Sequence, residues 1–132
     1  MILLRAFPFL ALVLIAYNIL IVLGGRSVGD VVGEVTLPSG AVWSITTGDV
    51  LVISGLALLF VEMVSASSRT ASVINHGLSL LVFLICLVEF LLVRACGTPE
   101  FLVITLITMI DVIAGYSISI RAARRDYAIE RD

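Results

Sequence analysis

The segment FLVITLITMIDVIAGYSISI, residues 101–120, decides the fold class of this chain. Its side chains are apolar or small, apart from one carboxylic acid, Asp111, near the middle. A helix of about 20 residues rises about 30 Å, which matches the hydrocarbon core of a bilayer. The segment therefore predicts a transmembrane helix with an ionisable group inside it.

Three further apolar runs precede it, at residues 6–25, 50–66 and 71–93, and the last two contain Glu62 and Glu89. Apolar residues make up 61% of the chain, whereas a soluble domain has about 45–50%. The first run is longer than the core of a secretory signal, so we expect it to be retained. The sequence predicts one membrane domain, residues 1–132, an all-α protein with four transmembrane helices in an up-down bundle.

The arginines predict the orientation of these spans. All eight basic residues are arginine. With four spans, two of them (Arg26 and Arg94) fall on one side of the membrane, and six fall on the other: Arg5, Arg69, Arg121, Arg124, Arg125 and Arg131. Basic flanks favour the cytoplasm, so both termini should be cytoplasmic. The tail, residues 121–132, should continue the last helix, with Arg121, Arg124 and Arg125 as anchors at the membrane interface.

The loop between the first two runs predicts a short β-hairpin. The β-forming stretches 34–37 and 41–46 flank a three-residue turn, Pro38-Ser39-Gly40. Trp43 suits the membrane interface, where its ring is buried and its N–H stays wet. The simpler expectation is a tryptophan packed down within the loop, with no ligand.

Polar side chains recur at helical spacing within the apolar runs. Each set should form a stripe that faces the other helices and not lipid. The stripes are Gly55, Glu62, Ser65 and Arg69; Asn75, Ser79, Cys86 and Glu89; and Thr105, Thr108, Asp111, Gly115 and Ser119, with Asn18 in the first run.

Counting from the turns predicts the depth of the ionisable groups. Glu62 and His76 each lie seven residues from Arg69, so they should form a pair near the cytoplasmic face. Asp111 should lie near the midplane, level with Asn18. Glu89 belongs to the outer half, and Arg94, five residues later, can either snorkel outward or reach back to it.

Composition excludes several classes of function. One histidine is too few for a di-haem cytochrome and leaves a metal cage short of ligands, so we expect no metal and no cofactor. No phosphate loop, serine–histidine motif or basic groove occurs, so we expect neither an enzyme nor a nucleic-acid binder. The two cysteines form no C-x-x-C pair. Cys86 suits packing, and Cys96, near the outer surface, can form an intermolecular bridge in an oxidising compartment.

Four segments carry a family resemblance that extends over nearly the whole chain. They are Leu37–Trp43, Gly48-Asp49, Phe60–Glu62 and Arg121–Asp126. They resemble segments of small four-span inner-membrane proteins from alphaproteobacteria. The resemblance implies a four-span topology in a bacterial inner (plasma) membrane, and it implies no activity.

Two functions remain open at this stage. The first is a non-enzymatic membrane protein that acts by association, as a homo-oligomer or as an accessory or scaffold subunit of a larger complex, with the lipid bilayer and another membrane protein or a second copy as partners. The second is a small proton- or cation-coupled transporter or channel that uses Asp111, Glu62 and His76. Acids inside a membrane serve both as contacts between helices and as ion pathways.

Overall fold

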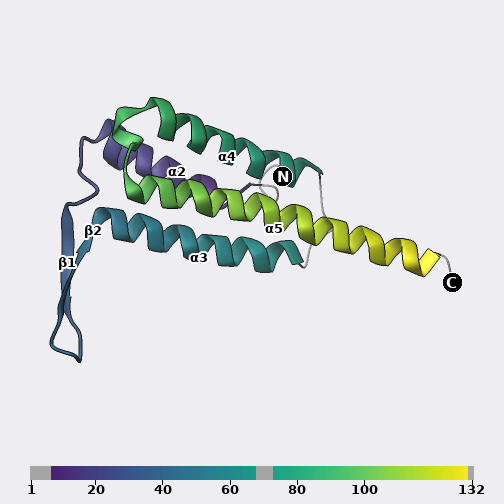
Figure 1. The fold of residues 1–132 in the computed structure, drawn as a ribbon, viewed down its shortest axis with the longest axis horizontal. Helices are drawn as coiled ribbons and strands as arrows, with labels where there is room; N and C mark the ends of the chain where they lie inside the picture. Colours follow the sequence, from purple (N-terminus) through teal and green to yellow (C-terminus); the bar gives the residue numbers. More distant parts are fainter. Residues whose placement is uncertain (1–6, 68–72, 131–132) are drawn as a thin grey trace.

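The computed structural model describes residues 7–67 and 73–130. These residues form the predicted helical bundle with a small β-hairpin at one end (Figure 1). In chain order the elements are helix α2 (Leu10–Tyr17), π-helix η1 (Asn18–Leu23), strands β1 (Val31–Thr36) and β2 (Val42–Thr46), helices α3 (Thr47–Ser67) and α4 (Val73–Leu92), 3₁₀ turn η2 (Arg94–Cys96) and helix α5 (Pro99–Glu130).

The helices alternate in direction and pack around one core. Helix α5 lies between α3 and α4, and α2 lies against the same two helices from the other side. Helix α2 begins, and helix α5 ends, at the end of the bundle opposite the hairpin. Helix α5 runs far beyond the other helices, so the prediction that residues after 120 continue the last helix is confirmed through Glu130.

Within residues 7–67 and 73–130, three helices are long and apolar enough to cross a membrane. They are residues 47–66 of α3, residues 74–92 of α4, and α5. The first apolar run differs from the predicted span, because its helical part is Leu10–Leu23, with eight α-helical and six π-helical residues. At 1.5 Å per residue such a segment covers about 21 Å, less than a hydrocarbon core of about 30 Å.

Local sequence explains where the helices begin and end. At the start of α3, the Thr46 hydroxyl accepts from the backbone N–H of Asp49, and the Asp49 carboxylate accepts from that of Thr46, at 3.1 and 2.9 Å. This is a capping box with Thr46 as the cap. Thr98 caps α5, since its hydroxyl accepts from the N–H of Phe101 at 3.2 Å. Gly25, at φ +66°, ends the first helical segment.

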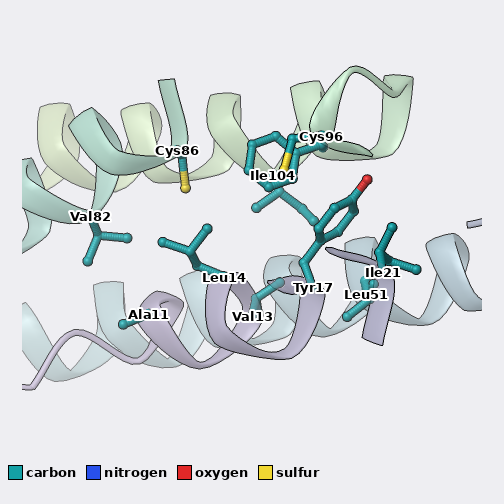
Figure 2. Close-up of a cluster of buried hydrophobic side chains, with 11 residues drawn as sticks. Ala11, Val13, Leu14, Tyr17, Ile21, Leu51, Val82, Cys86, Cys96 and Ile104 are labelled. Carbon is teal, nitrogen blue, oxygen red and sulfur yellow. The ribbon is translucent and has the colours of Figure 1, made fainter. Parts of the chain in front are cut away.

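The core holds apolar side chains from all four helices (Figure 2). Tyr17 is fully buried, and its ring meets that of Phe101 edge-on, with centroids 4.7 Å apart. The Tyr17 hydroxyl donates to the backbone carbonyl of Ala95 at 3.0 Å and lies 2.9 Å from the Thr98 hydroxyl. One side chain of the first helix thus fixes the junction between α4 and α5.

The predicted hairpin is confirmed. Strands β1 and β2 pair antiparallel, with Val35 opposite Trp43 and Glu34 opposite Ser44. The N–H of Gly40 donates to the carbonyl of Leu37 at 2.9 Å, and Gly40 itself has φ +84°. A β-turn followed by a left-handed glycine is a common three-residue hairpin loop.

Candidate functional site

The carboxyl group of Asp111 is buried where α5 packs against α4. Asp111 is 7% exposed. The Ser79 hydroxyl hydrogen-bonds to its carboxyl group, and His76, one helical turn before Ser79, interacts with it electrostatically. Asp111 therefore faces protein, as its stripe predicts.

His76 lies flat against α5. Its ring stacks on Tyr116 with centroids 5.1 Å apart and planes at 24°. A Cβ placed on Gly115 would lie 3.1 Å from Nδ1 of His76. Glycine at position 115, one turn from Asp111, therefore makes room for the imidazole of His76. The small-residue stripe of α5 contacts α4 at this glycine.

Glu62 binds the beginning of α2. Its carboxylate accepts from the backbone N–H of Leu10 at 3.4 Å and also interacts with the N–H of Phe9. The first N–H groups of a helix have no partner within the helix, and they carry positive partial charge, so a carboxylate is a good partner for them. Glu62 also interacts electrostatically with Asp111. The carboxyl groups of Glu62 and Asp111 and the imidazole of His76 therefore lie in the same region of the bundle.

Glu89 binds Asn18 across the α4–η1 contact. Nδ2 of Asn18 donates to Oε2 of Glu89 at 2.9 Å and to the carbonyl of Leu14 at 3.0 Å, which uses both amide hydrogens. The partner of Glu89 in the structure is thus Asn18, and Arg94 is exposed in η2, in agreement with the alternative that it extends outward. Asn18 is the first residue of the π-helix, and π-turns often lie where a side chain has a special role.

The prediction that Asp111 and Asn18 lie at the same level is wrong. Asp111 contacts Ser79, whereas Asn18 contacts Glu89, ten residues further along α4. Ten helical residues span about 15 Å, so Asp111 and Asn18 are not level. Asn18 lies five residues before the hairpin end of its segment at Leu23, whereas Asp111 lies twelve residues after the start of α5 at Pro99, so Asn18 is nearer the hairpin.

The acid that interacts with His76 among the described contacts is Asp111, not the predicted Glu62. Counting from the turn gave Glu62 and His76 the same depth. It could not show that Glu62 points at α2 while His76 points at α5.

Close packing completes the contacts between helices. Gly55 of α3 is buried, and a Cβ there would lie 3.4 Å from Cδ1 of Ile107 on α5. On α5, Thr105 and Thr108 are 4% and 1% exposed, and their hydroxyls donate to the carbonyls of Phe101 and Thr105 in the preceding turn. Gly55, Thr105 and Thr108 face protein as predicted, and the threonines satisfy their own hydroxyls; Arg69 of the predicted stripe lies outside the described residues.

Tyr17 is the buried polar residue whose role the sequence did not reveal. A tyrosine beside Asn18 in an apolar run is typical of a membrane interface as well as of a core. Only the fold shows that its hydroxyl reaches the α4–α5 junction, a contact between residues 78 positions apart.

The predicted interface anchors lie at opposite ends of the bundle. Trp43 is in the hairpin and is 42% exposed, so the expectation of a tryptophan packed down within the loop is wrong. Arg121, Arg124 and Arg125 are exposed on the extension of α5. Cys86 is buried as predicted, and Cys96, expected near the surface, is fully buried as well. A bridge through Cys96 would therefore require local opening of the bundle.

The side chains available for catalysis or metal binding are few. Within residues 7–67 and 73–130 no group of three histidine, cysteine or acidic side chains could hold a metal ion. No protein-family model, curated protein or solved structure matches this chain. Function must therefore be inferred from the contacts themselves.

Proposed function

We propose that this protein is a non-enzymatic, four-span inner-membrane protein that acts by association, as a homo-oligomer or as an accessory subunit of a larger membrane complex. The observation that carries this proposal is the set of contacts that the three acids make between helices. Each of the three acids in the apolar runs has its polar partner on a different helix. Glu62 joins α3 to α2, Glu89 joins α4 to η1, and Asp111 joins α5 to α4.

Such contacts are what a membrane bundle needs for stability. Apolar helices gain little from hiding apolar surface from lipid, so hydrogen bonds and close packing of small residues hold them together. The remaining adjacent pair, α3 and α5, meets at Gly55 and Ile107. The acids therefore have a structural role that requires no transported ion.

An apolar hollow supports the same conclusion. It measures about 330 Å³ and lies between the beginning of α2 and α4, where Phe7, Pro8, Leu78, Leu81 and Ile85 are among the side chains that line it. An ion would lose its hydration there without gaining ligands. The hollow is thus unsuited to an ion pathway.

One observation favours the second candidate, a proton-coupled transporter. Glu62 and Asp111 interact electrostatically, and His76 interacts with Asp111. Acids and a histidine at membrane depth are the groups that proton relays use. Transport would require the carboxyl groups to change charge, whereas a structural role requires only hydrogen bonding.

The deciding experiment measures assembly and flux on the same samples. Wild type, Glu62→Gln and Asp111→Asn are purified in mild detergent, sized by mass, and tested for proton flux in vesicles under a pH gradient. Association predicts a mass above one chain, or a co-purifying membrane protein, in all three samples, with no flux. A monomer whose flux disappears in both variants would refute association in favour of transport.

The orientation is tested separately. With four spans and cytoplasmic termini, a reporter fused at residue 40 should lie outside and one at the C-terminus inside. The same compartment for both reporters would mean that α3, α4 and α5 do not all cross the membrane, and the span count would then be wrong.

A further inference from the structure

The hairpin projects away from the bundle. Figure 1 shows β1 and β2 running across the direction of the helices, to one side of the helix ends. No loop separates the hairpin from the bundle here, because β2 ends at Thr46 and α3, one of the three potential spans, begins at Thr47. If α3 crosses a bilayer, the hairpin must therefore lie along the membrane surface, beyond the footprint of the helices.

The two faces of the hairpin differ in chemistry. Successive side chains of a strand point to opposite faces, so the pairs Val35–Trp43 and Gly33–Ile45 share one face. Leu37 continues the alternation onto the same face. We call this the Trp43 face; it consists of Gly33, Val35, Leu37, Trp43 and Ile45.

The opposite face is mainly polar. It carries Glu34, Thr36 and Ser44, together with Val42, and the Ser44 hydroxyl donates to the Glu34 carboxylate at 3.3 Å. Glu34 is the only ionisable residue between positions 31 and 46. The Trp43 face therefore contains no charge.

The Trp43 face has no partner within the described chain that would hide it. Val35, Leu37 and Trp43 are 45%, 42% and 42% exposed. An isolated two-stranded hairpin is at best marginally stable in water and needs a surface for its apolar side. The nearest apolar surface is the bilayer beside α3, and tryptophan is the residue that most favours its interface.

The unpaired edges of the two strands limit how deeply the hairpin can enter the bilayer. Each strand has one edge whose backbone N–H and C=O groups are unpaired, and such groups are very costly in hydrocarbon. The hairpin can therefore lie at the level of the lipid head groups but cannot sink below it.

We propose that the β1–β2 hairpin is a lipid-binding paddle, which lies flat on the outer bilayer surface with the Trp43 face turned toward the acyl chains and Glu34 turned toward water. The paddle fixes the height of the bundle in the membrane at the hairpin end, as the arginines of α5 do at the other end. This inference concerns the contact with lipid and does not depend on whether the bundle acts by association or by transport.

Trp43 is the only tryptophan in the chain, so its fluorescence tests the proposal directly. The whole protein is reconstituted in phosphatidylcholine vesicles whose acyl chains carry bromine either close to the head group or close to the chain end. The paddle predicts strong quenching by the shallow bromines, weaker quenching by the deep ones, and little quenching by aqueous iodide.

Each other pattern overturns the proposal. Quenching by iodide alone would place the hairpin in water. Protection from all three quenchers would mean that protein, such as a second copy of the chain, covers the tryptophan. Quenching mainly by the deep bromines would place it within the hydrocarbon.

Two matched variants test which face meets the lipid. Val35→Asp puts a charge on the Trp43 face, and Val42→Asp puts the same charge on the opposite face, next to Trp43 in sequence. Val35→Asp should lose the quenching by shallow bromines and gain quenching by iodide, whereas Val42→Asp should behave as wild type. Helical circular dichroism confirms that the bundle is intact in both. Equal effects of the two charges would refute the assignment of the faces.

Discussion

The contact between Asn18 and Glu89 offers the sharpest test of how this bundle is held together. The structure joins the two side chains at 2.9 Å, and the same amide also donates to the carbonyl of Leu14 at 3.0 Å. Sequence alone left open whether Arg94 reaches back to Glu89 or extends outward. Asn18→Leu, Glu89→Leu and their double variant isolate the contact, and Arg94→Ala is the control.

The expected magnitude follows from the chemistry of the pair. Polar contacts between membrane helices contribute about 0.6 kcal/mol on average and up to about 1.7 kcal/mol. Both groups are half-buried, so we expect a coupling in the upper part of that range, about 1–2 kcal/mol. Asn18→Leu should cost the most, because it leaves the Glu89 carboxyl group without its donor. Arg94→Ala should change the unfolding free energy by less than about 0.5 kcal/mol, the usual limit for a surface substitution.

The assay is reversible unfolding of the full chain in mixed micelles, with increasing denaturing detergent and a helical circular dichroism readout. The coupling free energy is the difference between the double variant and the sum of the two single variants. A coupling below about 0.3 kcal/mol is within the usual additivity error and would refute the contact. A loss in Arg94→Ala as large as that in Asn18→Leu would refute the choice of partner.

Three further predictions use the same unfolding assay or a thiol assay. Asp111→Asn should retain most of the stability, because the amide can still hydrogen-bond to Ser79. Asp111→Leu should cost about 1–3 kcal/mol, because it leaves the Ser79 hydroxyl unpaired. Equal stability of the two variants would contradict a buried polar contact. Gly77→Ala should stabilise the protein by up to about 1 kcal/mol, since a Cβ there meets nothing within 4 Å. Gly115→Ala should gain less or lose stability, because its Cβ would lie 3.1 Å from His76, and an equal gain in both variants would show that the imidazole moves freely. Burial, with a smaller effect of nearby acidic charge, raises the pKa of the Cys96 thiol to about 11. In a chain with Cys86→Ala, maleimide should therefore react far more slowly with the folded than with the unfolded protein at pH 8, and rapid labelling of the folded protein would contradict this. The free energy of unfolding should also fall as the pH rises from about 9 toward 11, because the thiol of the unfolded chain loses its proton first.

Much of the local structure was predictable because its causes are local. The turn Pro38-Ser39-Gly40 determines the hairpin, since only a glycine readily takes the positive φ that this loop requires. Thr98 caps α5 as expected from a hydroxyl residue before a proline. The burial of Thr105, Thr108 and Asp111 followed from their spacing along one helical face.

The first apolar run shows where local reasoning failed. Hydropathy predicted a uniform span over residues 6–25, but the structure has an α-helix that begins at Leu10 and changes to a π-helix at Asn18. Hydropathy measures transfer to lipid and carries no information about such a change in hydrogen bonding. Asn18 lies near the hairpin end of this segment and contacts Glu89, whereas Asp111 contacts Ser79, so the predicted common depth of Asn18 and Asp111 was wrong.

The sequence by itself determined that the chain is helical and apolar, that a hairpin follows the first helical segment, and that the acids within the apolar runs face protein. Those properties depend on side-chain type and on spacing within one element. Only the tertiary structure decided the partners: Asn18 for Glu89, the start of α2 for Glu62, and Ser79 with His76 for Asp111. Partners are decided by the rotation and axial shift of each helix against its neighbours, which result from the packing of all the side chains together and are not encoded in the periodicity of any one helix.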